Sequence, residues 1–303
     1  KTVLTVTLST ATAAVLWRSG GSRPRVLAAA GALAGLTALA QENINITLPI
    51  LLGWIAWRAP RGRRLLCGAA LVAGFVIVVS PATIRNYAVS GDFVLITSGG
   101  GEVFYTGNNE HASGHYRSPA FVRPDPFFEH EDFRAEAARR LGRPHGAITR
   151  KESDAFWWRE GMRFITEDPG RYLVLLWDKI TTYFTAYERP DNYSYDNFRL
   201  FLPVLRLPLL HFGWIAPLGI VGLVWSVRRA AELLPLHAVM GAYVASALLF
   251  FTQDRYRMPM VPLMTLFAAH AAVSLARAAR AGAWARFGLA GAAVVALALL
   301  VNR

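Results

Sequence analysis

Residues 81–114 read PATIRNYAVSGDFVLITSGGGEVFYTGNNEHASG, and here an apolar, membrane-compatible segment gives way to a long polar one. Within this stretch, two runs rich in β-branched and aromatic residues, 93–97 and 103–106, flank the three glycines at residues 99–101. The second run is followed by Gly107-Asn108-Asn109. Glycine and asparagine favour the positive φ angles of tight turns, and glycine lets a ligand or another backbone approach closely. The pattern predicts a hairpin-like polar platform on a bilayer surface, with a loop that merely turns as the alternative.

The composition predicts an integral membrane protein. The chain has 303 residues, is 54% hydrophobic and has a mean hydropathy of +0.31, which is too apolar for a domain whose whole surface is wetted. Eight apolar segments can be drawn, at residues 2–17, 26–40, 44–57, 65–80, 204–227, 234–251, 258–275 and 287–301. A span perpendicular to the bilayer needs about 20 residues, so the shorter of these segments must include flanking residues to cross it.

The net charge of +12 is distributed in a way that argues against nucleic acid as a partner. Residues 81–199 hold 15 basic and 17 acidic side chains, so the positive excess belongs to the apolar parts of the chain. Arginines concentrated in short connectors follow the positive-inside pattern and form no stripe along which phosphates could lie. Twelve arginines lie in or beside four connectors: Arg18, Arg23, Arg25; Arg58, Arg61, Arg63, Arg64; Arg228, Arg229; and Arg277, Arg280, Arg286.

Threading the eight segments alternately places all four basic connectors on one side of the membrane and the long polar segment on the other. We therefore expect an α-helical polytopic protein with about eight transmembrane helices: four in residues 1–80, an α/β-containing extracytoplasmic loop domain with interfacial helices in 81–199, and four in 200–303. Small residues at 28–35 predict close helix packing in the second span. The sequence begins at Lys1 without a signal-peptide pattern, so we expect it to be part of a longer chain.

The polar segment itself contains helix signals. Thr149 to Glu152 forms a capping box, and Ala155, Trp158, Met162 and Ile165 follow it at helical spacing as one apolar stripe. Asp168-Pro169 supplies an N-cap with proline at the first helical position. The helix that it starts has an aromatic-rich face, which we place at the membrane interface, with a core helix of a soluble domain as the alternative: Tyr172, Leu173, Leu176, Trp177, Ile180, Tyr183 and Phe184.

Charged side chains gather where this topology places the outer membrane face. Arg85 leaves the fourth apolar segment, and Arg255 and Arg257 lie in the turn between the sixth and seventh. Arginine at the edge of a bilayer is costly, and its planar fork matches phosphate oxygens in pairs. The alternative is an interfacial anchor whose side chain reaches the lipid headgroups.

Five runs of the sequence share one resemblance: Pro81-x-x-Ile84-Arg85-Asn86-Tyr87, Gly91-Asp92-Phe93, the glycine-rich run from Gly99 to Asn109, Glu188-x-Pro190-Asp191-Asn192-Tyr193 and Arg255-Tyr256-Arg257-Met258-Pro259. Together they resemble the C-terminal two-thirds of bacterial membrane glycosyltransferases, which are similar to the dolichyl-phosphate-mannose protein mannosyltransferases and the aminoarabinose transferases of lipid A and share the GT-C fold. The resemblance covers about residues 25–275. The sequence departs from these proteins at Gln41-Glu42-Asn43, where relatives commonly carry a basic residue.

The resemblance implies transfer of a sugar from a polyprenyl-phosphate carrier to a protein or glycolipid acceptor. The protein would be a multi-pass protein of the bacterial inner membrane, with its long loop on the periplasmic side. In such proteins the catalytic carboxylate lies in an outer loop between the first two spans, a region with no counterpart in this sequence, so we expect the chain by itself to be inactive. The carboxylates that could replace it as a base are Glu42, Asp92, Glu102 and Asp254.

Two groups of residues are expected to bind the donor and acceptor. Arg85, Arg255 and Arg257 would surround the carrier phosphate, and hydroxyl-binding side chains would face the sugar or acceptor: Asn86, Tyr105, Asn108, Asn109 and Tyr256. The rival functions are a lipid-linked-sugar flippase or transporter, which would be expected to carry ionisable residues midway through its spans, and a structural subunit of an envelope complex.

The sequence provides no cofactor site. Cys67 is the only cysteine and lies in an apolar segment, so it is expected to be a small buried side chain. His111 and His115, with Glu110, could hold a metal from a loop, but solvated loop histidines are the simpler interpretation. A divalent metal in the full-length enzyme stays open.

Overall fold

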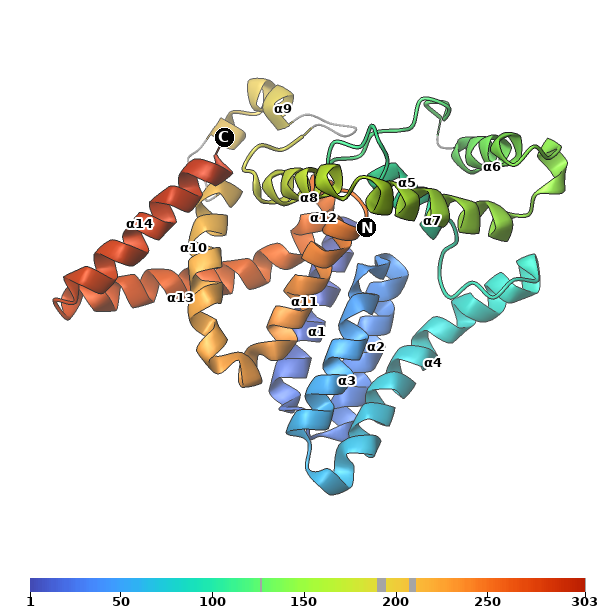
Figure 1. Ribbon diagram of the computed structural model, residues 1–303. Coiled ribbons are helices and arrows are strands. Elements are labelled where there is room, and N and C mark those ends of the chain that lie inside the picture. The colour runs from blue at the N-terminus through green and yellow to red at the C-terminus, as the bar shows by residue number, and fades with distance from the viewer. Residues whose placement is uncertain (126, 190–194, 207–210, 303) are drawn as a thin grey trace. The chain divides into compact units, whose positions relative to one another are not determined.

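The computed structural model describes residues 1–125, 127–189, 195–206 and 211–302 (Figure 1). The chain divides into two compact units, described separately below. The first unit comprises Lys1–Pro81, Phe184–Val244 and Asp254–Arg303, and the second comprises Ala82–Tyr183 and Ala245–Gln253.

The first unit is built from long apolar helices joined by short turns. Its helices are α1 (Thr2–Ser19), α2 (Pro24–Ala40), α3 (Thr47–Arg58), most of α4 (Arg64–Ser90), α9 (Tyr195–Phe201), α10 (Phe212–Ser226), most of α11 (Ala230–Leu249), α12 (Asp254–Arg257), α13 (Val261–Arg280) and α14 (Trp284–Val301). Single 3₁₀ turns lie between them: η1 (Glu42–Ile46), η2 (Arg61–Arg63), η4 (Pro203–Arg206), η5 (Val227–Arg229) and η6 (Met258–Met260).

Four helical stretches in the described part of the chain are long and apolar enough to cross a membrane: Arg61–Ser90, Phe212–Leu249, Asp254–Arg280 and Trp284–Val301. The protein is therefore a helical membrane protein, but the expected eight spans are not found. Helix α3 has only 12 residues and α2 only 17, and α1 contains five threonines that lower its hydropathy. Helices α10 and α11, which the sequence divides into two spans, are connected through η5 as the helical stretch Phe212–Leu249, although the chain turns at η5 and the two helices run in opposite directions (Figure 1).

Close helix packing through small residues is confirmed. In α2 and α4, a Cβ atom added to Gly31 would lie 2.0 Å from the backbone oxygen of Leu71, and one added to Gly74 would lie 2.0 Å from that of Ala28. The two backbones thus touch where both helices carry glycine, an approach that any side chain would prevent.

Buried polar contacts also link the helices of the first unit. The hydroxyls of Ser9 in α1 and Tyr243 in α11 are 2.6 Å apart, and the Trp54 indole in α3 donates to the Ala231 carbonyl at 3.0 Å. Cys67 is buried in the core of this unit, as expected.

The second unit is formed by the end of α4, α5 (Gly100–Gly107), α6 (Glu129–Arg140), η3 (His145–Ala147), α7 (Arg150–Glu167), α8 (Pro169–Phe184) up to Tyr183, and the end of α11. Its core centres on the indole of Trp157, which donates to the Phe133 carbonyl at 3.0 Å. The capping box at Thr149 and Glu152 and the Asp168 cap of α8 are both confirmed. The expected apolar stripe on α7 is only partly buried: Trp158 and Ile165 are half-buried, whereas Ala155 and Met162 are exposed. The buried apolar positions of this helix are the neighbouring Phe156, Trp157 and Gly161.

The predicted α/β loop domain is wrong, since the described residues contain no β-strand. Residues 93–97 are irregular, and the run from Gly99 to Asn109, expected to form a hairpin-like platform with an extended segment at 103–106, contains helix α5 instead. Gly99 has a positive φ of 94° at the N-cap, and the Gly101 amide donates to Asp154 Oδ1 at 2.6 Å. The expected close backbone approach does occur, because a Cβ on Gly107 would lie 1.8 Å from the Phe250 carbonyl oxygen.

Helix α8 is amphipathic, and its aromatic-rich face is only partly buried. Leu175, Lys179 and Tyr183 are buried, whereas Leu173, Trp177 and Ile180 are exposed. A core helix would bury these large apolar side chains, so their exposure favours the predicted location at the membrane interface. That location stays a prediction.

Candidate active site

A carboxyl group and an imidazole meet at the start of α5. Glu102 lies in the first turn of this helix and is only 8% exposed, and its Oε2 atom is 2.5 Å from Nδ1 of His130 in α6. The His130 side chain is 65% exposed, so the imidazole is accessible from solution. Of the four carboxylates proposed as a base, Glu102 is thus held against a second group that can carry a proton.

Burial and the hydrogen bond between the two groups shift both pKa values. The pKa of Glu102 is raised, because burial, the largest effect, outweighs the hydrogen bond with His130, which lowers it. The hydrogen bond to Glu102 is the largest effect on His130 and raises the pKa of the imidazole. When Glu102 is ionised, Nδ1 of His130 carries the hydrogen of this bond and Nε2 is left to accept a proton.

A buried lysine lies at the other end of α5. Lys179 in α8 is fully buried, and its Nζ atom donates to Oδ1 of Asn108 and to the carbonyl oxygen of Leu248, both at 2.9 Å. The Asn108 amide nitrogen donates to the Leu249 carbonyl at 2.8 Å. No carboxylate is recorded within ion-pair distance of this lysine in the described part of the chain, and burial lowers its pKa to about 7.

The remaining candidate polar side chains in α5 and just after it are engaged within the second unit. The Asn109 amide donates to the Tyr105 carbonyl at 2.8 Å and its oxygen accepts from the His111 amide at 2.8 Å. Tyr105 is half-buried with its ring centroid 4.5 Å from that of Trp157. Asn108, Asn109 and Tyr105 therefore hold the local fold, and their roles as sugar or acceptor ligands stay predictions.

Arg85 and Asn86 lie inside α4 rather than after it. The Asn86 amide donates to the carbonyl oxygens of Val94 and Ile96, at 3.2 and 2.8 Å, and so fixes the segment that follows the helix. Arg85 and Asp92 are both exposed to solvent. Arg85 is consequently available to an anion, whereas the Asn86 amide is occupied.

The basic turn between α11 and α13 forms α12. Asp254 Oδ2 accepts from the Arg189 amide at 2.6 Å, and Asp254 Oδ1 lies 3.4 Å from Nη2 of Arg257. The Arg257 guanidinium is buried, donates to the Thr185 carbonyl and lies 4.4 Å from the Phe212 ring centroid. Arg257 therefore has partners within the protein.

Arg255 and Tyr256 belong to the same turn, and Glu42 to η1. Arg255 is exposed, with its guanidinium 5.3 Å from the ring centroid of the half-buried Tyr256. Glu42 is half-buried. Arg85 belongs to the second unit and Arg255 and Arg257 to the first, so their grouping around one phosphate stays a prediction.

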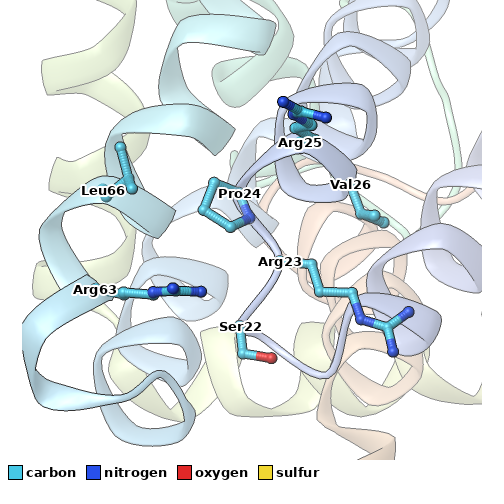
Figure 2. A pocket seen from close by; sticks show the side chains of 7 residues that line it. All are labelled: Ser22, Arg23, Pro24, Arg25, Val26, Arg63 and Leu66. Atoms are coloured by element: carbon cyan, nitrogen blue, oxygen red, sulfur yellow. The ribbon is translucent and has the colours of Figure 1, made fainter.

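Two pockets lie among the arginine-rich connectors of the first unit. One, of ≈ 510 Å³, is drawn in Figure 2 and lies between the turn before α2 and the start of α4. There Arg63 extends toward the turn at Ser22 and Pro24, whereas Arg23 extends away from Arg63. The second pocket, of ≈ 730 Å³, lies among α10, α13 and α14. Neither of these two pockets is lined by a residue that the sequence singled out for the site.

The metal hypothesis and one of the matching runs have no further support. Within the described ranges, no group of three or more His, Cys, Asp or Glu side chains is placed to hold a metal ion. The run Pro190-Asp191-Asn192-Tyr193 lies outside the described residues.

No protein-family model, curated protein or solved structure matches this chain.

Two of the residues described above, Lys179 and His130, were not recognised in the sequence. Lys179 could have been found, because residues 175, 179 and 183 recur at four-residue spacing and place a lysine on the buried face of α8. His130 carried no local signal, since its partner Glu102 is 28 residues away.

Proposed function

We propose that the protein is a membrane glycosyltransferase that moves a sugar from a polyprenyl-phosphate carrier to an acceptor hydroxyl at the membrane surface. The observation that carries this proposal is the Glu102–His130 pair, a buried carboxyl group joined to an exposed imidazole at 2.5 Å. The pair belongs to the polar unit into which the candidate span Arg61–Ser90 leads.

Transfer to a hydroxyl needs a group that takes its proton. The acceptor oxygen forms a bond to the anomeric carbon while the bond from that carbon to the phosphate oxygen breaks, and the carrier leaves as a phosphate anion. In our proposal Nε2 of His130 accepts the hydroxyl proton, and Glu102 orients the ring and stabilises the resulting imidazolium. A positioned base of this kind typically contributes about 10²–10⁴-fold to the rate.

The leaving phosphate needs positive charge close to it. Arg85 and Arg255 are exposed and are our first choices for this contact, while the buried Arg257 acts through its contacts with Asp254 and Thr185. The resemblance alone places the base outside this chain. The Glu102–His130 pair gives the chain a base of its own, and here the proposal departs from the expectation of an inactive chain.

Sugar release from polyprenyl-phosphate donors tests the proposal. Membranes containing the protein are given a panel of carrier-linked hexoses and pentoses, labelled in the sugar, and the release of label from the carrier, to water or to a membrane acceptor, is measured over time. His130→Asn is expected to lower protein-dependent release by about 100-fold or more. Glu102→Gln is expected to cause a smaller loss, since the imidazole is kept.

His111→Asn is the matched control, because His111 is an exposed histidine of the same unit whose 3.4 Å ion-pair partner, Glu110, is also exposed. Normal release by this variant and loss in His130→Asn would support the proposal. Movement of intact donor between leaflets without cleavage would instead identify a flippase. Equal sugar release by all the variants would contradict the role of Glu102 and His130 as the base.

A further inference from the structure

The pocket among α10, α13 and α14 is lined by positive charge without a balancing carboxylate. Three arginines contribute to it from three different elements: Arg228 from η5, Arg277 from the last turn of α13 and Arg286 from the first turn of α14. No aspartate or glutamate is among its lining residues. In the described part of the chain, none of these guanidinium groups forms an ion pair with a carboxylate. The pocket is thus complementary to an anion.

The rest of the lining is suited to a lipid. Trp225, Ser274 and His270 add hydrogen-bonding groups beside the arginines. Alanines of α13 and α14 and the 79% exposed Leu289 form the apolar part of the wall. The volume, ≈ 730 Å³, is within the range that binds small molecules and headgroups.

The location of the pocket favours a lipid over a soluble anion. It lies at the turn between Asp254–Arg280 and Trp284–Val301, two of the stretches long and apolar enough to cross a membrane. Leu289 and Val273 are exposed along these helices, where acyl chains would contact them. A headgroup in the pocket would therefore lie at the level where a bilayer ends, which is where arginine clusters between helices bind anionic lipids.

We propose that this pocket is a binding site for an anionic glycerophospholipid, whose phosphodiester contacts Arg228, Arg277 and Arg286 and whose acyl chains lie along α13 and α14. The site is distinct from the predicted donor site, because none of its lining residues belongs to that group. By the positive-inside pattern it belongs to the cytoplasmic leaflet. The proposal does not depend on the enzymatic activity.

Native mass spectrometry of the protein released from nanodiscs tests the proposal. Nanodiscs containing equal amounts of phosphatidylglycerol and phosphatidylcholine are compared for wild type, Arg277→Gln, Arg286→Gln and the double variant. Wild type is expected to retain phosphatidylglycerol preferentially. Each substitution should weaken retention by about tenfold or more, the effect of losing a hydrogen bond to a charged group.

Arg280→Gln is the matched control, because Arg280 is an exposed arginine at the end of the same helix that does not line the pocket. Circular dichroism of each variant excludes a folding defect. Equal retention by Arg280→Gln and by the double variant would overturn the site. Retention of phosphatidylcholine at the level of phosphatidylglycerol, or displacement of the lipid by millimolar inorganic phosphate or by polyprenyl phosphate, would overturn the choice of ligand.

Discussion

The Nζ atom of Lys179 lies 2.9 Å from Oδ1 of Asn108, and both side chains are fully buried. This bond joins α8 to the C-terminal end of α5 in a chain whose only other lysines are Lys1 and Lys151. Because the only hydrogen-bond partners recorded for the ammonium in the described part of the chain are neutral oxygens, its charge is stabilised less well than it would be in water. The stability of the second unit should therefore depend on pH.

The expected dependence follows from the pKa of Lys179, which burial lowers from 10.5 to about 7. Between these two values the unfolded lysine holds a proton that the folded lysine has lost, so stability rises with pH from about 7 toward 10.5. Lys179→Met should remove this rise, as measured by thermal unfolding in detergent across this pH range. Lys151→Met, at an exposed lysine, should leave the rise unchanged. An unaltered slope in Lys179→Met would contradict the assignment.

The proposed base gives a second pH prediction. Because the pKa of His130 is raised above its ordinary 6.5, chiefly by its hydrogen bond to Glu102, sugar release should increase as pH rises through that raised value. Glu102→Gln removes the carboxylate and should move the midpoint of kcat/KM to lower pH. The pH profile of the residual activity measures this shift. A midpoint that is the same in wild type and Glu102→Gln would show that another group controls the rate.

The contact between α2 and α4 predicts that alanine substitution lowers stability at glycines facing another backbone but not at a glycine facing open space. Gly31→Ala and Gly74→Ala should each destabilise the protein by about 1–3 kcal/mol, because each new methyl group would overlap a backbone carbonyl of the facing helix. Gly53 in α3 has no neighbouring atom within 4 Å of an added Cβ. Gly53→Ala should therefore be neutral or stabilising, by up to about 1 kcal/mol from helix propensity. Chemical denaturation in mixed micelles measures both, and equal effects at the three positions would contradict the packing.

The predicted topology can be tested with single cysteines at exposed positions. Ser98→Cys should react with an impermeant thiol reagent in intact cells, because Ser98 follows α4 on the predicted outer side. Ala281→Cys, at the basic turn after α13, should react only after the membrane is permeabilised. The native Cys67 is buried and should give little background. Labelling of Ala281→Cys alone in intact cells would reverse the orientation.

The interfacial location of α8 predicts two different environments on one helix. A nitroxide at Leu173→Cys, on the exposed apolar face, should collide mainly with oxygen dissolved in lipid. A nitroxide at Asp178→Cys, also exposed, should collide mainly with a water-soluble nickel complex. Power-saturation measurements in liposomes compare the two. Equal access of the nickel complex to both positions would place this face of α8 in water.

Features that depend on nearby residues could be predicted from the sequence. The capping box of Thr149 and Glu152 and the Asp168 cap are complete within a few residues, and the small residues of α2 allow close packing with any partner helix. The membrane class followed from composition. The number of spans did not, because α3 is too short and α1 too rich in threonine to meet the length and hydropathy of a span.

Features that depend on distant residues were beyond the sequence. Gly100 to Gly107 has the composition of a turn and an extended run but forms a helix, and the carboxylate that accepts the Gly101 amide in its first turn, Asp154, lies more than 50 positions later. The candidate site shows the same limit. Glu102 was one of four equivalent carboxylates until His130 was found beside it. Arg257 was expected at a phosphate and is instead surrounded by Asp254, Thr185 and Phe212.

The end of α11 is determined by side chains from elsewhere in the chain. A helix ends with carbonyl groups that no later turn of its own can satisfy. In α11, two of these carbonyls, those of Leu248 and Leu249, accept from Lys179 and Asn108, which are 69 and 141 positions earlier in the chain. During synthesis both donors emerge before the helix that they terminate. The last turn of α11 belongs to the second unit, so the position at which this helix stops depends on residues that are synthesised long before it.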